Sequence, residues 1–199
     1  MMDINLKPAV LLATLMGVAS FLIFSCLPST SPGEDYFLAP DSAGYKVPDG
    51  ATVVDSIPEN LEDGDTLHLS GEYTRKITLF DKHGTKKNPI RIEAQDATII
   101  NYGMALVDSS YIIVEGLSAH GGEEGHGFTV LRESDTPVEG IVLRRIASEG
   151  YYIGLSVCAQ GYPPITDLVV EDSIFAGATG SNMSIAEGCS IKIDRVTTV

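Results

Sequence analysis

The sequence predicts an all-β protein in which parallel strands stack as a solenoid of the β-helix type. Three observations lead to this prediction: a repeat of short β-rich segments, alternation of apolar side chains within them, and no helical segment between the copies. The chain has 199 residues, of which 44% are hydrophobic and 20 are glycine. This length and composition suit a turn-rich domain with a substantial core.

The repeat lies beyond residue 100 and has a longer and a shorter part. The longer segments are YIIVEGLSA from Tyr111, GIVLRRIAS from Gly140, DLVVEDSIF from Asp167 and SIKIDRVTT from Ser190. The shorter segments GMALV, GFTVL, GLSVC and NMSIA begin at residues 103, 127, 154 and 182, which are 24, 27 and 28 residues apart. Alternating apolar residues indicate strands, and strands repeated at this period indicate a solenoid whose stacked copies share one core.

Each repeat supplies apolar side chains that we expect to point inward. In the longer segments these are Ile112/Val114, Ile141/Leu143, Leu168/Val170 and Ile191/Ile193, and in the shorter ones Met104/Leu106, Phe128/Val130, Leu155/Val157 and Met183/Ile185. Two residues past the second apolar position stand Gly116, Arg145, Asp172 and Arg195. Gly and Asp tolerate left-handed backbone, so this column is predicted to form turns.

A charged column lies beside these turns and is expected to serve structure. It consists of Glu115, Arg144, Glu171 and Asp194. We predict that Arg144–Glu171 and Arg145–Asp172 pair across adjacent coils, where each pair contributes about 0.2–1 kcal/mol. Such a ladder would fix the register of the coils.

The N-terminal half divides into segments of different kinds. Residues 1–26 are predicted to be a signal peptide of the lipoprotein type, with Cys26 as the site of lipid attachment. An uncleaved anchor and ordinary secretion are the alternatives, and all three place the domain outside the cytoplasm. Residues 27–44 are expected to form a linker, 45–66 an N-terminal cap and 67–199 the coils.

Charge and cysteine content limit the partners. The chain has 27 acidic and 13 Lys and Arg residues, a net charge of -14. This charge disfavours nucleic acid and would repel an acidic polysaccharide unless a basic patch or bound cation reversed the local field. Cys158 and Cys189 could form a disulfide in an exported protein, or remain two small buried thiols.

The segments LEDGDTLHLSGEYTRKITL, HGTKKNPIRIEAQ and YIIVEGLSAHGG resemble the N-terminal coils of the pectin-lyase-like right-handed parallel β-helix superfamily. Within it they look most like the chondroitinase B and alginate lyase family, over residues 45–199. The resemblance implies right-handed coils and a saccharide groove along the sheet of shorter strands. Because the sequence ends inside a strand, at RVTTV, we expect further C-terminal coils in the complete protein.

On this mapping the groove floor would be Ala105, Thr129, Ser156 and Ser184, and the chemistry would come from the flanking loops. β-Elimination needs a base, a proton donor to the leaving oxygen, and a cation or amide beside the uronate carboxylate. His126, Tyr152 and Arg132 are the catalytic candidates. The candidates for substrate binding are His120, Tyr151, Thr129, Ser156 and Asn182. The alternative is that each side chain caps a strand and bonds to loop backbone.

Residues around His126 suggest two other chemistries, of which one is left open and one is rejected. Calcium could be bound by Glu123, Glu124 and Asp135, although no cofactor is required. The Gly-His-Gly motif around His126 matches polygalacturonases, but those glycosidases need paired aspartates on neighbouring coils, where Ala105 and Ser156 stand instead. The motif match is therefore interpreted as coincidence.

Together these observations predict an exported, monomeric β-helix protein, lipid-anchored at the membrane, that cleaves uronate-containing polysaccharide by β-elimination. The alternatives are a non-catalytic carbohydrate-binding or surface-adhesion module, and a glycoside hydrolase. Its expected partner is an acidic or neutral polysaccharide.

Overall fold

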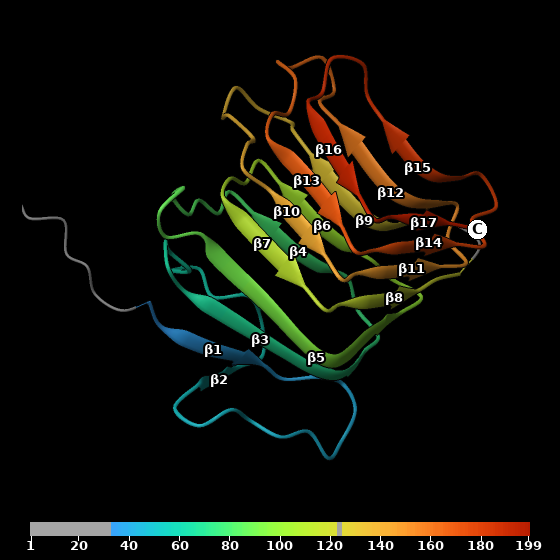
Figure 1. The fold of residues 1–199 in the computed structure, drawn as a ribbon. Coiled ribbons are helices and arrows are strands. Elements are labelled where there is room, and N and C mark those ends of the chain that lie inside the picture. Colours follow the sequence, from blue (N-terminus) through green and yellow to red (C-terminus); the bar gives the residue numbers. More distant parts are fainter. Residues whose placement is uncertain (1–32, 123–124) are drawn as a thin grey trace, which may run out of the picture. The chain divides into compact units, whose positions relative to one another are not determined.

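The structure, a computed structural model, describes residues 33–122 and 125–199. It confirms the predicted fold class, because these residues form an all-β, right-handed parallel β-helix of about six turns (Figure 1). The predictions for the signal segment with Cys26, and for Glu123 and Glu124, lie outside the described residues. Within the described part of the chain, no helix is long and apolar enough to cross a membrane.

Two parallel sheets build the solenoid. The first sheet has twelve strands and the second has five, in the order β15-β12-β9-β6-β4. The strands of the first sheet are β1 (Asp35–Leu38), β2 (Thr52–Val54), β3 (Thr66–Tyr73), β5 (Ile90–Ile100), β7 (Ile112–Glu115), β8 (Ser118–His120), β10 (Val142–Arg144), β11 (Ala147–Glu149), β13 (Leu168–Glu171), β14 (Ile174–Ala176), β16 (Ile191–Asp194) and β17 (Thr197–Thr198). Those of the second sheet are β4 (Ile77–Phe80), β6 (Met104–Val107), β9 (His126–Leu131), β12 (Ile153–Cys158) and β15 (Ser181–Ile185).

The inward columns follow the predicted alternation. In β6, β9 and β12 the register pairs Leu106 with Val130, and Val130 with Val157, and all three are buried. The predicted inward residues of the last coil differ, because Ile185 is 37% and Ile193 is 48% exposed. These two side chains have a neighbouring coil on one side only within the described residues.

The predicted turn column is confirmed. Gly116, Arg145, Asp172 and Arg195 have φ angles of 79°, 51°, 51° and 50°. Each residue lies where the chain leaves one half of the first sheet and enters the other, for example between β7 and β8. At Gly116 a Cβ atom would lie 2.4 Å from the carbonyl oxygen of Ala94, so only glycine fits there.

Glycines at the start of the shorter segments let the coils approach each other. A Cβ at Gly103 would lie 2.0 Å from the carbonyl oxygen of His126, and one at Gly127 would lie 2.0 Å from Ser148 Oγ. The glycines that mark the repeat in the sequence are therefore sites of close stacking.

The folded region begins earlier than the sequence predicted. Strand β1 lies within residues 27–44, which were expected to form a linker, and it pairs in parallel with β2 and β3. Tyr36 and Leu38 of β1 join the core, and the Tyr73 hydroxyl donates to the carbonyl of Leu38 at 2.7 Å. Two large apolar side chains in a short run make β1 a strand despite the Pro and Ser residues around it.

The charged ladder forms, but its ion pairs differ from those predicted. The register does place Arg144 beside both Glu115 and Glu171. The guanidinium groups of Arg144 and Arg145 nevertheless pair with Glu115 of the preceding coil, and not with Glu171 and Asp172. Asp172 pairs with Arg195 of the following coil. The predicted partners were wrong because strand register only aligns the charged residues of successive coils. The side-chain torsions decide whether an arginine pairs with the preceding or the following coil.

Candidate active site around His126

A cavity of about 410 Å³ lies on the side of the second sheet where the N-terminal ends of its strands are aligned, which we call the strand-start edge. Its lining residues come from neighbouring coils: Lys76, Asn101, Tyr102, Gly103, Gly125, His126, Thr129 and Tyr151. Lys76 directly precedes β4, Asn101 to Gly103 join β5 to β6, and His126 begins β9. We call this the His126 cavity. Parallel strands in register bring these starts to one edge, so residues far apart in sequence gather there.

His126 is exposed to solvent at this edge. Partial burial of the ring, and then the positive charge of Lys76, lower the pKa of His126 below its usual value. Both effects disfavour the imidazolium ion. The ring is therefore held neutral at neutral pH, which is the form that can accept a proton.

Tyr151 takes a different role from the one the sequence suggested, and Tyr102 lies beside it at the cavity. Tyr151 is buried, so it offers no open stacking face, and burial raises its pKa to about 12. Its hydroxyl donates to the backbone carbonyl of Tyr102, which fixes the backbone at the cavity wall. Tyr102 is 49% exposed and also lines this cavity.

Arg132 lies at the opposite end of β9 from His126. A strand of this length separates the two ends by about 17 Å. Arg132 is buried, and its guanidinium donates to the carbonyls of Ser134 at 3.1 Å, Pro163 at 3.0 Å and Asp135 at 2.7 Å. The structure therefore does not bring Arg132 to His126, and its charge is used to hold loop backbone.

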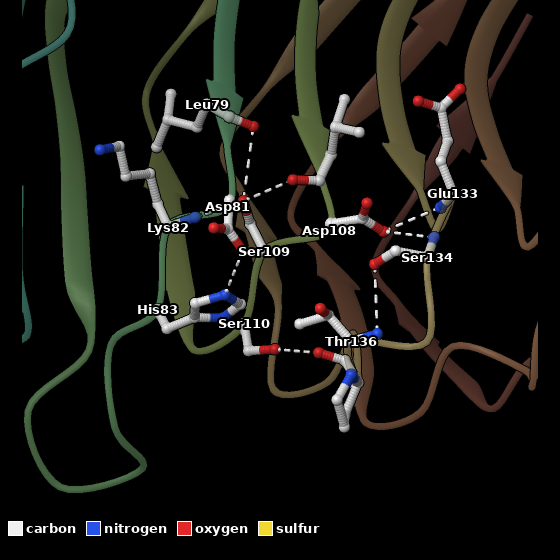
Figure 2. Close-up of polar contacts among 12 residues, drawn as sticks. Leu79, Asp81, Lys82, His83, Asp108, Ser109, Ser110, Glu133, Ser134 and Thr136 are labelled. Atoms are coloured by element: carbon white, nitrogen blue, oxygen red, sulfur yellow. Dashed lines mark hydrogen bonds and ion pairs between the residues drawn. The ribbon is translucent and has the colours of Figure 1, made fainter. Parts of the chain in front are cut away.

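The opposite side of the second sheet, where its strands end, is called the strand-end edge. Its side chains form further hydrogen bonds that hold the backbone of the following loops, as Figure 2 shows. The Asp108 carboxylate accepts from the backbone N–H groups of Glu133 at 2.8 Å and Ser134 at 3.2 Å. Ser109 Oγ accepts from the Lys82 N–H at 3.1 Å, and Ser110 Oγ donates to the carbonyl of Pro137. The strand-end edge is thus built for turn structure, whereas the strand-start edge holds the cavity.

Four other predicted residues do not line the His126 cavity. His120 lies 3.4 Å from Glu149, Ser156 is buried, and Asn182 bonds to Ala178 N–H at 3.3 Å and to the Val199 carbonyl at 3.2 Å. Tyr152 is 53% exposed, with its ring over Gly180. Of the predicted substrate-binding residues, Thr129 and Tyr151 line the cavity.

The described residues contain no cluster of metal-ligating side chains and no disulfide. No group of three His, Cys, Asp or Glu side chains among residues 33–122 and 125–199 is placed to hold a metal ion. Asp135 follows the end of β9 that lies away from Gly125. Cys158 and Cys189 are both free thiols.

Sequence reasoning missed Lys76, Asn101 and Tyr102. The repeat was recognised only beyond residue 100, although the register pairs Ile77 with Met104 and Met104 with Phe128. Extending the repeat by one coil places Lys76 at the position of Gly103 and Gly127. This register is the signal that could have found the missing lysine.

Comparison of the chain with protein-family models, with curated proteins and with solved structures finds no match.

Proposed function

We propose that this protein is an exported β-helix related to the pectin-lyase-like superfamily, which cleaves uronate-containing polysaccharide by β-elimination at the His126 cavity. The observation that carries the proposal is the gathering of Lys76, Tyr102 and His126 around one cavity. These residues supply the cation, the phenol and the neutral base that this reaction needs.

The proposed reaction uses each group once. His126 removes the proton on C5, next to the uronate carboxylate, whose negative charge is held by the Lys76 ammonium and the Asn101 amide. The electrons of the C5–H bond form the C4=C5 double bond as the C4–O bond breaks. The leaving oxygen takes the proton of the Tyr102 hydroxyl, and the proton on His126 returns to the Tyr102 oxygen through water.

Lys76 contributes in two ways in this scheme. Its charge opposes the net negative charge of the protein at the place where an acidic substrate would bind. It also lowers the pKa of His126. No further cation is required, because an ammonium group and an amide beside the carboxylate stabilise the charge that develops at C5.

A non-catalytic carbohydrate-binding module is the second candidate. It is favoured by the openness of Tyr102 and Tyr152 to solvent, since exposed aromatic rings can stack on sugars without cleaving them. The two candidates differ in whether an unsaturated product appears.

The test is incubation of the purified domain with alginate, pectate and a glycosaminoglycan, followed by ultraviolet absorbance of the unsaturated uronate. We expect one polymer to be cleaved. His126→Gln should slow the cleavage about 10²–10⁴-fold, the usual contribution of a general base. Tyr152→Phe, outside the cavity, should leave the rate unchanged. Binding of a polymer without any absorbance change would reject the lyase and favour the binding module.

A further inference from the structure

A larger cavity, of about 850 Å³, lies on the outward face of the first sheet. Its floor consists of outward side chains of β3, β5 and β7, including His68, Glu93 and Glu115. The loop 42–49 forms one wall, and Arg144 and Arg145 form the other. We call it the outer groove. It shares no residue with the His126 cavity.

The loop wall is anchored firmly at its base. Asp41 accepts from the Thr74 N–H at 2.6 Å and from the Arg75 guanidinium, and its own N–H donates to the Glu72 carbonyl at 2.8 Å. Ser42 Oγ accepts from the Glu72 N–H at 3.0 Å. The groove is therefore shaped before any ligand arrives, which reduces the entropy lost on binding.

Tyr45 gives this wall an aromatic surface. Its ring stacks on Phe37, with centroids 5.3 Å apart and planes at 25°, and Phe37 is completely buried. Tyr45 itself remains 40% exposed and lines the groove. One face of the ring is thus fixed against the protein, and the residue keeps open area that a flat apolar ligand face could cover.

Most of the charged groups on the floor and far wall already have partners; among the described residues that line them the exception is Asp96 of β5, an acid that would repel an acidic ligand. Arg144 and Arg145 both pair with Glu115, while the His68 ring lies 3.4 Å from Asp35 and 4.0 Å from Glu93. A charged ligand would have to compete with these pairs and would leave one partner without its counter-charge. A neutral polyol can instead share the free lone pairs of carboxylates and the free N–H groups of guanidinium.

The floor also disfavours a peptide ligand. Strands β3, β5 and β7 are each paired on both sides within the sheet. An extended peptide gains its affinity mainly from backbone hydrogen bonds to an open strand edge. Here only side chains are available, as suits a ligand recognised through hydroxyl groups.

We propose that the outer groove binds a neutral oligosaccharide, with one sugar ring stacked on Tyr45 and its hydroxyls bonded to Glu93, Glu115 and Arg145. The volume lies within the range of pockets that enclose small ligands. This site does not depend on β-elimination at the His126 cavity.

The test is calorimetric titration of the whole chain with neutral cello-, xylo-, manno- and galacto-oligosaccharides, and with pectate and alginate oligosaccharides as charged competitors. We expect one neutral series to bind, with an affinity that changes less than about twofold between low and high salt because no net charge is neutralised. The chain has no tryptophan, so tyrosine fluorescence should report the same binding.

Tyr45→Ala should weaken binding about three- to tenfold, the range for losing an aromatic contact. Tyr162→Ala, at an exposed tyrosine outside the groove, is the matched control and should bind normally. Arg145→Gln is a second groove variant, and it should fold because Arg144 still pairs with Glu115. His126→Gln should bind as the parent does, which separates this site from the proposed lyase.

Binding of none of the neutral series would overturn the proposal. So would stronger, salt-sensitive binding of the charged oligosaccharides, or neutral binding that survives both Tyr45→Ala and Arg145→Gln.

Discussion

At the scale of single residues, Lys76 shows how a neighbouring positive charge favours the neutral form of a histidine. It lines the His126 cavity and lowers the pKa of His126, in addition to the effect of partial burial. A histidine with a lowered pKa stays neutral down to a lower pH. A general base of this kind would stay active below the usual titration range of histidine.

We therefore predict that Lys76→Met raises the pKa of His126. The measurement is proton NMR titration of the imidazole C–H signals, assigned with His126→Gln, and it needs no substrate. If the domain cleaves a polymer, the acidic limb of its pH–rate profile should shift to higher pH in the same variant. Lys87→Met, at a lysine outside the cavity, should leave the titration unchanged. An unaltered His126 titration in Lys76→Met would show that burial alone sets the pKa.

At the scale of elements, the turn between β7 and β8 combines two constraints on Gly116. Its φ of 79° is unfavourable for a residue with a Cβ, and that atom would meet the Ala94 carbonyl at 2.4 Å. The corresponding turns hold Arg145, Asp172 and Arg195 at φ near 50°, so left-handed backbone alone is tolerated there. The close contact is what makes Gly116 indispensable.

Replacing this glycine should separate the two costs. Gly116→Ala should lower the free energy of unfolding by more than about 2 kcal/mol, from left-handed strain plus a backbone clash. Gly44→Ala is the matched control, because Gly44 has φ 86° and a Cβ added there would meet no atom within 4 Å. It should cost only about 1 kcal/mol. Urea denaturation measures both, and equal losses would mean that the contact with Ala94 relaxes freely.

At the scale of the whole molecule, the coils differ in how well they are covered. The central strands β6, β9 and β12 each have a paired strand on both sides, whereas β15 and β16 have one paired neighbour among the described residues. Ile185 and Ile193 of the last coil are partly exposed, in contrast to the buried Val130 and Leu143. In a solenoid each coil is stabilised mainly by its neighbours, so stability should fall toward an open end.

Hydrogen exchange should reveal this gradient in the chain of 199 residues. We expect amides of β15 to β17 to exchange by local opening, well before those of β6, β9 and β12. Mass spectrometry of peptic fragments gives the rates coil by coil. Uniform protection across all coils would instead indicate that this chain unfolds as a single cooperative unit.

Most of the fold could be predicted from the sequence, because each coil repeats the same local pattern. The apolar positions of the longer segments, such as Val114 and Leu143, and the turn at Gly116 follow from alternation and backbone preference alone. The direction of the Arg144 ion pair did not follow, because strand pairing offers a carboxylate on either side.

The candidate site was predicted less well. His126, Thr129 and Tyr151 line one cavity, but the Arg132 guanidinium is bonded to carbonyls of the following loop and to that of Pro163, 31 residues away. Whether an arginine is free or already bonded to distant backbone cannot be read from its immediate neighbours in the sequence. The burial of Tyr151 could not be predicted for a similar reason: its hydroxyl bonds to the carbonyl of Tyr102, 49 residues away in the sequence.

The in-register stacking of coils has a consequence for growth of the molecule. In a spherical domain, surface per residue shrinks as the chain lengthens, and one core stops growing at about 250–300 residues. A stack of coils adds the same outer area with each turn while the cross-section of its core stays constant. Duplication of a single coil would therefore add one more strand position to the sheet under the outer groove and one to the strand-start edge, while the packing of the core stays the same.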